Sequence, residues 1–334
     1  MGFVHEPMTW TNFAWLLLSG VLLFVIVLVF VTYVVYFERQ VARRMQLSKV
    51  SNEVISSGLL HTVADVWKQL HKENSLPQNV DRPVFIFAPV LAFVPAFVVL
   101  AAIPYSERLY FADLDVGLLY YVALTSISMV GVLLSGWASN NHDALLGSIH
   151  SVAKMMSYQI PFVISVVGVT MLSGSLNLRT IVSEQGQWFW QWHFIPQAIG
   201  FCVFIIAGLA GLNRTLFDLS KARPMLVEGG RAEYSGFRYV LFMLAEYTYV
   251  LAIASLATVL FLGGWHAPAP MLVFIPGVVW FLLKFAVVVF FLIWMRAMLT
   301  RLRTNQLMNL GWKLLLPLAL LNVFVTALYI ELLR

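Results

Sequence analysis

The chain has 334 residues, of which 60% are hydrophobic and 11% charged, and its mean hydropathy is +0.84. This composition excludes a water-soluble globular protein and predicts an all-α, polytopic membrane protein with one membrane domain over residues 1–334. The net charge of +5 does not indicate nucleic-acid binding, since membrane proteins retain Lys and Arg on the cytoplasmic side. The single cysteine, Cys202, lies in an apolar run, which excludes disulfides and thiolate metal sites.

Eight apolar runs approach or exceed the roughly 20 residues that cross a bilayer as a helix. They cover residues 12–36, 84–104, 117–138, 160–176, 194–212, 237–262, 271–299 and 312–333. Loops after odd-numbered runs, with their flanks, hold 17 of the 21 Lys and Arg residues, against three in the other loops and tails. The positive-inside rule therefore predicts external termini and places loops one, three, five and seven in the cytoplasm.

The first loop, residues 37–82, is the longest and contains one amphipathic segment. Apolar residues recur there at helical spacing, which predicts a helix on the membrane surface or packed on the helix ends. The apolar positions are Leu59, Leu60, Val63, Val66, Trp67 and Leu70. Asp65, Lys68, Gln69 and Lys72 fall on the other faces, and Glu38 and Arg39 stand where the first run leaves the membrane. Ordinary interface charge is one interpretation of Glu38 and Arg39, and a functional site is the other.

The third loop begins with Asn140 and Asn141, which favour a helix cap, and continues as an amphipathic piece before Pro161. His142, Asp143 and His150 match no metal-ligand spacing, so we expect no metal there.

Two ionisable residues lie inside the apolar runs, Glu246 and Lys284. A charge at that depth costs roughly 2.5–3.5 kcal/mol and needs a partner, so the two either pair with each other structurally or serve a function.

The fifth loop, residues 213–236, mixes four basic and three acidic residues with three glycines and Pro224. Such a loop is either a solvated connection or functional.

Eight motifs spread over the chain share one resemblance. They are YFERQVARRMQ (36–46), GLLHTVADVWK (58–68), ADLDVGLLYY (112–121), GWASNN (136–141), GSLNL (174–178), LNRTLFDL (212–219), EYSGFRYVLFMLAEY (233–247) and QLMNLGWKLLLPL (306–318). Over essentially its full length the chain resembles the H subunit of bacterial NADH-quinone oxidoreductase, the respiratory complex I.

The resemblance implies an eight-helix subunit of a bacterial plasma-membrane complex. Loops one, three and five would form the membrane side of the quinone chamber and dock iron-sulfur subunits. Small membrane subunits and lipid would lie beside it, while FMN and the iron-sulfur clusters would sit on partners, with quinone as substrate. The expected quinone-binding residues are Glu38, Arg39, Asp65, Lys68, Arg214, Asp218 and Glu233. The expected proton-route residues are Asp218, Glu228, Glu233, Glu246 and Lys284.

The chain departs from the family mainly where the family has acidic residues. Carboxylates usual in the family are absent at Gln159, Gly211, Lys221, Arg223, Met225 and Asn305. Gln, Gly, Met, Lys and Arg cannot replace a titrating Glu near pH 7. Two interpretations remain: weakened or absent proton coupling, or compensating charges on a partner subunit.

Three alternative functions differ in what they predict. A membrane anchor of a multisubunit [NiFe] hydrogenase shares the expected fold, and a structural paralogue without coupling fits the lost carboxylates. A secondary transporter predicts an inverted repeat, which the sequence does not show.

Overall fold

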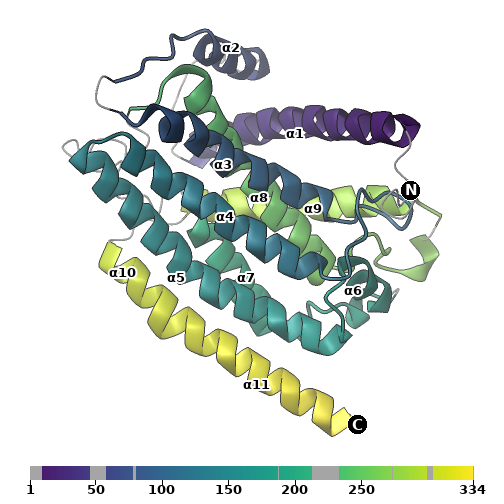
Figure 1. Ribbon diagram of the computed structural model, residues 1–334. Helices are drawn as coiled ribbons and strands as arrows, with labels where there is room; N and C mark the ends of the chain where they lie inside the picture. The colour runs from purple at the N-terminus through teal and green to yellow at the C-terminus, as the bar shows by residue number, and fades with distance from the viewer. Residues whose placement is uncertain are drawn as a thin grey trace.

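The computed structural model describes residues 10–45, 58–77, 80–186, 188–212, 233–272, 274–298 and 304–333. Within these ranges the chain is a helical bundle without strands (Figure 1). Its α-helices are α1 (Trp10–Met45), α2 (Gly58–Leu70), α3 (Arg82–Ala101), α4 (Gly117–Ala138), α5 (His142–Ser173), α6 (Leu178–Glu184), α7 (Ala198–Gly211), α8 (Gly236–Leu260), α9 (Gly277–Met298), α10 (Thr304–Asn309) and α11 (Leu316–Leu333). A π-helical stretch, Leu310–Leu315, joins α10 to α11.

Seven described helical segments are long and apolar enough to cross a membrane, and α7 is shorter. Its 14 residues span about 21 Å, less than the roughly 30 Å of a bilayer core. The fifth apolar run was predicted from residue 194, but the helix starts at Ala198 because the preceding residues form turns around Pro196. The polytopic, all-helical fold is confirmed, whereas the count of eight crossings stays a prediction.

The fourth apolar run, 17 residues long, belongs to a helix nearly twice that length. α5 has 32 residues and continues through Pro161, which is buried inside it. Proline is tolerated within membrane helices because neighbouring groups satisfy the freed backbone. Asn141 caps the helix as expected, since its side-chain oxygen accepts from the backbone N–H of Asp143 at 3.1 Å.

The helices alternate in direction, so the described starts and ends gather at two ends of the bundle. α1 begins and α11 finishes at the same end, opposite α2 and α10 (Figure 1). Which membrane face this end occupies stays a prediction.

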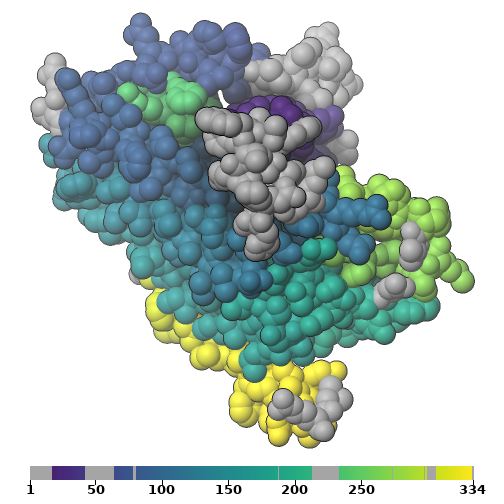
Figure 2. Space-filling view, turned by 45° about the vertical axis from the view of Figure 1, so that its right-hand side comes forward, coloured from purple at the N-terminus to yellow at the C-terminus, as the bar shows by residue number. Residues whose placement is uncertain are grey.

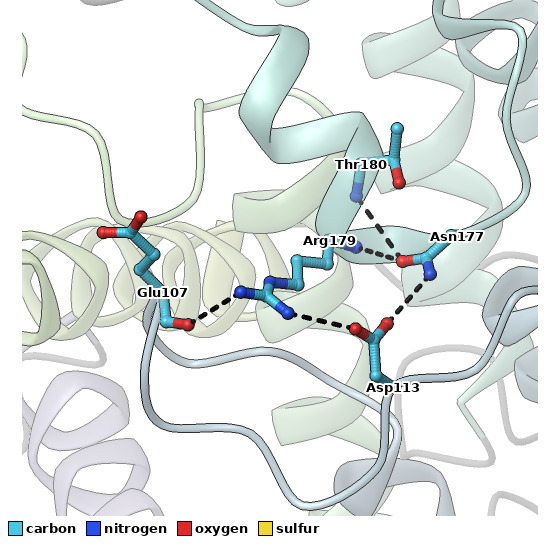
Figure 3. A network of polar contacts seen from close by, with 5 residues as sticks. All are labelled: Glu107, Asp113, Asn177, Arg179 and Thr180. Carbon is cyan, nitrogen blue, oxygen red and sulfur yellow. Dashed lines mark hydrogen bonds and ion pairs between the residues drawn. The ribbon is translucent and has the colours of Figure 1, made fainter. Parts of the chain in front are cut away.

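A network of polar contacts joins the segment between α3 and α4 to the start of α6, at the end of the bundle that we predict to be external (Figure 3). Arg179 Nη1 donates to Asp113 Oδ2 at 3.1 Å, and Asn177 Nδ2 donates to Asp113 Oδ1 at 2.8 Å. Arg179 is one of the three basic residues of the predicted external segments, and this carboxylate balances its charge.

α8 is the most buried of the crossing helices, and the C-terminal segment is the least buried. α11 lies along one edge of the bundle, and α2 lies over the opposite edge (Figure 2).

A buried cluster of polar side chains joins α11 to the rest of the bundle. Asn322 Nδ2 donates to Gln197 Oε1 at 2.6 Å, and Gln197 Nε2 donates to Thr326 Oγ1 at 2.6 Å. Hydrogen bonds between side chains are a common means of joining membrane helices.

Candidate functional site

A cavity of about 450 Å³ lies between α1, α2 and α8. Its apolar wall comes from α1 and α8, and its polar part comes from α1, α2 and the residues after α2. The lining residues are Val31, Val35, Arg39, Asp65, Val66, Lys68, Gln69, Lys72, Val240, Met243, Leu244 and Tyr247. We call it the α2 cavity. It has the form of a ligand site, mostly apolar with a few polar groups at one part.

An ion pair crosses the polar part of the α2 cavity. Arg39 Nη1 lies 3.0 Å from Asp65 Oδ2, and the two side chains are 39% and 34% exposed. The pair therefore remains accessible to an entering molecule while holding the end of α1 to α2. Lys68 and Lys72 add two further cations to the same wall.

α2 presents polar side chains to this cavity, as the expected binding roles of Asp65 and Lys68 required. Asp65, Lys68 and Gln69 line the cavity, whereas Trp67 is 64% exposed on the outer side. The apolar stripe was expected to be buried in the membrane surface or the bundle. Val66 of this stripe lines the cavity, and the burial of the stripe in the membrane surface stays a prediction.

Glu38 does not line the α2 cavity. It forms an ion pair with Arg296 near the end of α9, and both side chains are 18% exposed. Arg39 and Glu38 thus attach the end of α1 to two different neighbours, α2 and α9. Arg296 is a functional candidate that sequence reasoning missed, although its position at the basic end of an apolar run was a signal.

Glu233 lies apart from the α2 cavity, at the turn between α4 and α5. Its Oε1 accepts from Asn141 Nδ2 at 3.0 Å. Glu233 therefore connects the third loop with the start of α8 instead of contributing to the cavity lining.

The first loop and the start of α8 are nevertheless joined directly. Ser235 Oγ donates to the Glu73 carbonyl at 3.0 Å, and the Phe237 N–H donates to Asn74 Oδ1 at 3.1 Å. Gly236 between them has a φ of +60°, and a Cβ there would meet Asn74 Oδ1 at 2.5 Å. The sequence therefore needs glycine at this contact.

Three expected site residues, Arg214, Asp218 and Glu228, lie outside the described residues, as does most of the fifth loop. The structure therefore places three of the seven expected quinone-binding residues in one cavity: Arg39, Asp65 and Lys68.

A second, smaller cavity of about 70 Å³ lies between α3, α4, α5, α7 and α8. Its lining includes Glu246, Tyr121 and Tyr249, and two positions where the resemblance implies acids, Gln159 and Gly211. We call it the core cavity. Gln159 Nε2 donates to Thr125 Oγ1 at 2.9 Å, and nothing lies within 4 Å of a Cβ built on Gly211.

Glu246 and Lys284 do not pair with each other, so that interpretation was wrong. Lys284 Nζ donates to the carbonyls of Leu262, Gly264 and His266, beyond the end of α8. Glu246 lies 16 residues before Leu262, about 24 Å along a helix.

Comparison with known proteins finds relatives over nearly the whole chain. The family model described as NADH dehydrogenase matches residues 18–327. Proteins named as the H subunit of NADH-quinone oxidoreductase are similar over nearly full length. The one from Brevibacillus brevis is 52% identical over 98% of this chain and 97% of its own. The one from Anoxybacillus flavithermus is 55% identical over 96% and 95%. The one from Bacillus cereus is 53% identical over 98% of both chains.

The chain belongs to the NADH dehydrogenase family, among the H subunits of NADH-quinone oxidoreductases. The resemblance seen in the sequence motifs is thereby confirmed. Within the family, the α2 cavity contains residues of the YFERQVARRMQ and GLLHTVADVWK motifs, and α8 carries the EYSGFRYVLFMLAEY motif. Of the positions where the resemblance implies an acid, Gln159 and Gly211 line the core cavity, and Asn305 lies in α10.

Proposed function

We propose that this chain is the membrane subunit of a bacterial complex-I-type NADH-quinone oxidoreductase and that its α2 cavity receives the quinone. The names of the relatives support the first part and do not favour a hydrogenase anchor. The composition of the α2 cavity carries the second part. Valines of α1 and α8 suit an isoprenoid tail, and Arg39, Asp65 and Lys68 suit the oxygens of the head group.

The chain contributes binding and orientation, and redox centres on partner subunits supply the electron. Among the described residues, no group of three or more His, Cys, Asp or Glu gathers as a metal site. FMN and the iron-sulfur clusters belong to partners in this proposal. A partner would contact the outer side of α2 and the segment after it, where Trp67 and Leu76 respectively are exposed apolar residues.

The experiment uses two matched ion pairs. Asp65→Asn breaks the pair with Arg39 in the cavity, whereas Asp113→Asn breaks the pair with Arg179 at the other end. The pairs have similar distances, 3.0 and 3.1 Å, and similar exposure. NADH:quinone activity is measured in membranes over a range of short-chain quinone concentrations.

We expect Asp65→Asn to raise the apparent KM for quinone by roughly tenfold, the equivalent of about 1.4 kcal/mol. Asp113→Asn should leave KM within about twofold of the native value, since such surface pairs contribute little. Equal effects of both variants on KM would reject the cavity as the quinone site.

We further infer that proton coupling through the core cavity is weak. Glu246 lines it, but Gln159 and Gly211 supply no titrating group there. Asp218, Glu228 and Glu233 remain candidates of the wider route. Carboxylates on a partner subunit would restore coupling. The number of protons moved per NADH distinguishes weak coupling from coupling restored by a partner.

A further inference from the structure

Lys284 lies buried in α9, about two helical turns after its start at Gly277, and is 7% exposed. Its ammonium has a defined set of partners. Nζ donates to the carbonyl oxygens of Leu262 at 2.6 Å, Gly264 at 3.1 Å and His266 at 2.7 Å. The ring of Trp192 lies on one side, with its centroid 3.8 Å from Nζ.

The backbone after α8 is shaped to bring these carbonyls together. α8 ends at Leu260, and Gly263 and Gly264 follow with φ values of +70° and +46°. Neither position has room for a side chain. A Cβ on Gly263 would meet Trp192 Nε1 at 2.6 Å, and one on Gly264 would meet Val182 Cγ1 at 2.8 Å. Only glycine adopts these positive φ values with little conformational strain.

The electrostatics of the site favour a cation. The C-terminal end of a helix carries a partial negative charge, and α8 ends at this turn. The face of an indole ring adds a further attraction for an ammonium. These terms offset the cost of burying a charge that no carboxylate among its described hydrogen-bond partners balances.

The three acceptors match the three N–H donors of an ammonium. A carbonyl oxygen accepts a hydrogen bond but does not take up the proton near neutral pH. The geometry therefore does not support Lys284 as a member of the proton route. The three carbonyl acceptors instead fit a Lys284 ammonium that stays charged and in place.

We propose that residues 262–266 and Trp192 form a cage selective for a primary ammonium, and that Lys284 fills it as a tethered ligand to set the position of α9. Lys284 lies 12 residues before Arg296, about 18 Å along α9. By fixing α9 it positions Arg296 against Glu38, beside the proposed quinone cavity. The cage itself does not depend on the quinone proposal, and only this last consequence rests on it.

The test removes the Lys284 side chain and supplies a free primary ammonium ion in its place. Lys284→Ala is made in the intact complex, and the midpoint of its heat dissociation is measured in detergent. n-Propylammonium, which replaces the missing three carbons and the nitrogen, is titrated in. Tetramethylammonium, which has no N–H group, is the control ion. Lys313→Ala, at the opposite end of the bundle, is the control variant.

We expect Lys284→Ala to lower the midpoint by several degrees and n-propylammonium to restore it in a saturable manner. Tetramethylammonium should not restore it, and Lys313→Ala should not respond to either ion. Failure of n-propylammonium to restore the midpoint, or equal rescue by tetramethylammonium, would overturn the cage.

Two further variants decide the case if Lys284→Ala does not accumulate. Lys284→Met keeps the volume and loses the charge, and Lys284→Arg keeps the charge but replaces the tripod of donors with a planar group. Both should lower the midpoint relative to the native complex. Native stability of either variant contradicts the proposal. Quinone KM is not part of this readout, so failure of the cage leaves the quinone site to its own experiment.

Discussion

Glu246 and Tyr247 are neighbours on α8 but line different cavities. Tyr247 faces the α2 cavity, and Glu246 faces the core cavity. Successive helical residues point about 100° apart, so one helix forms a wall of both spaces. Substitutions at these adjacent positions should therefore separate quinone binding from proton coupling.

Tyr247→Leu should raise the apparent quinone KM about three- to tenfold while the proton yield per NADH stays unchanged. Glu246→Gln should do the reverse, lowering the proton yield with little change in KM. Both are measured in proteoliposomes with the same quinone. A shared phenotype would show that the two cavities act as one.

Restoring acids to the core cavity should increase the proton yield. Gly211→Glu has open space for its side chain, and Gln159→Glu replaces an amide of the same shape. Combined with Glu at 221, 223 and 225, these changes should raise the protons moved per NADH above the native value. A native complex that already gives the full yield would contradict weak coupling and favour acids on a partner.

The contact between α3 and α4 should not tolerate a methyl group at Gly131. A Cβ there would meet the Ala92 backbone nitrogen at 2.5 Å, beside the hydrogen bond from Ser128 Oγ to the Ala92 carbonyl at 2.8 Å. Gly131→Ala should destabilise the subunit by about 1–3 kcal/mol. Gly20→Ala in α1, where nothing lies within 4 Å, is the matched control and should be neutral or slightly stabilising. Thermal unfolding in detergent measures both.

Acid should destabilise the end of the bundle that carries His193 and His266. Burial lowers the pKa of both imidazoles below the ordinary value near 6.5. The folded state then binds fewer protons than the unfolded state, so the stabilising contribution is present above pH 6.5 and is lost as pH falls below it. His193→Gln and His266→Gln should reduce the fall of the unfolding midpoint between pH 7.5 and 5. If the variant with both substitutions shows the same fall of the unfolding midpoint with pH as the native protein, the two histidines are not its source.

Thiol labelling tests the predicted membrane orientation. Ser51→Cys, in the predicted cytoplasmic first loop, should resist a membrane-impermeant thiol reagent applied to intact cells. Asp115→Cys, at the other end of the bundle, should react. Cys202→Ser is the background for both, and reversed labelling would invert the topology.

The sequence predicted the crossing helices well because long apolar runs in a bilayer have few alternatives to a helix. The runs around residues 117–138 and 237–262 agree with α4 and α8 almost to the residue. The limits of α5 and α7 were wrong because Pro161 is tolerated within the bundle, and because turns occupy residues 194–197.

Which neighbour each helix face contacts was harder to predict than where the helices lie in the sequence. The spacing of Trp67 and Leu70 indicated an amphipathic α2, but periodicity does not say which face meets a cavity. Arg39 and Asp65 are 26 positions apart, so their pairing follows from tertiary packing. Likewise, no local pattern shows that three backbone carbonyls near Gly264 receive Lys284.

The attachment of α11 through Asn322 has a consequence for biogenesis. The translocon releases this helix last, after Gln197 has already entered the membrane. Until α11 arrives, Gln197 Oε1 lacks the donor that Asn322 supplies, and Nε2 keeps only the Gly168 carbonyl. An unsatisfied polar group in lipid is unfavourable, so the nascent bundle exposes a docking point that only its own C-terminal helix fills. A chain truncated before Asn322 would lack both hydrogen bonds between Gln197 and α11.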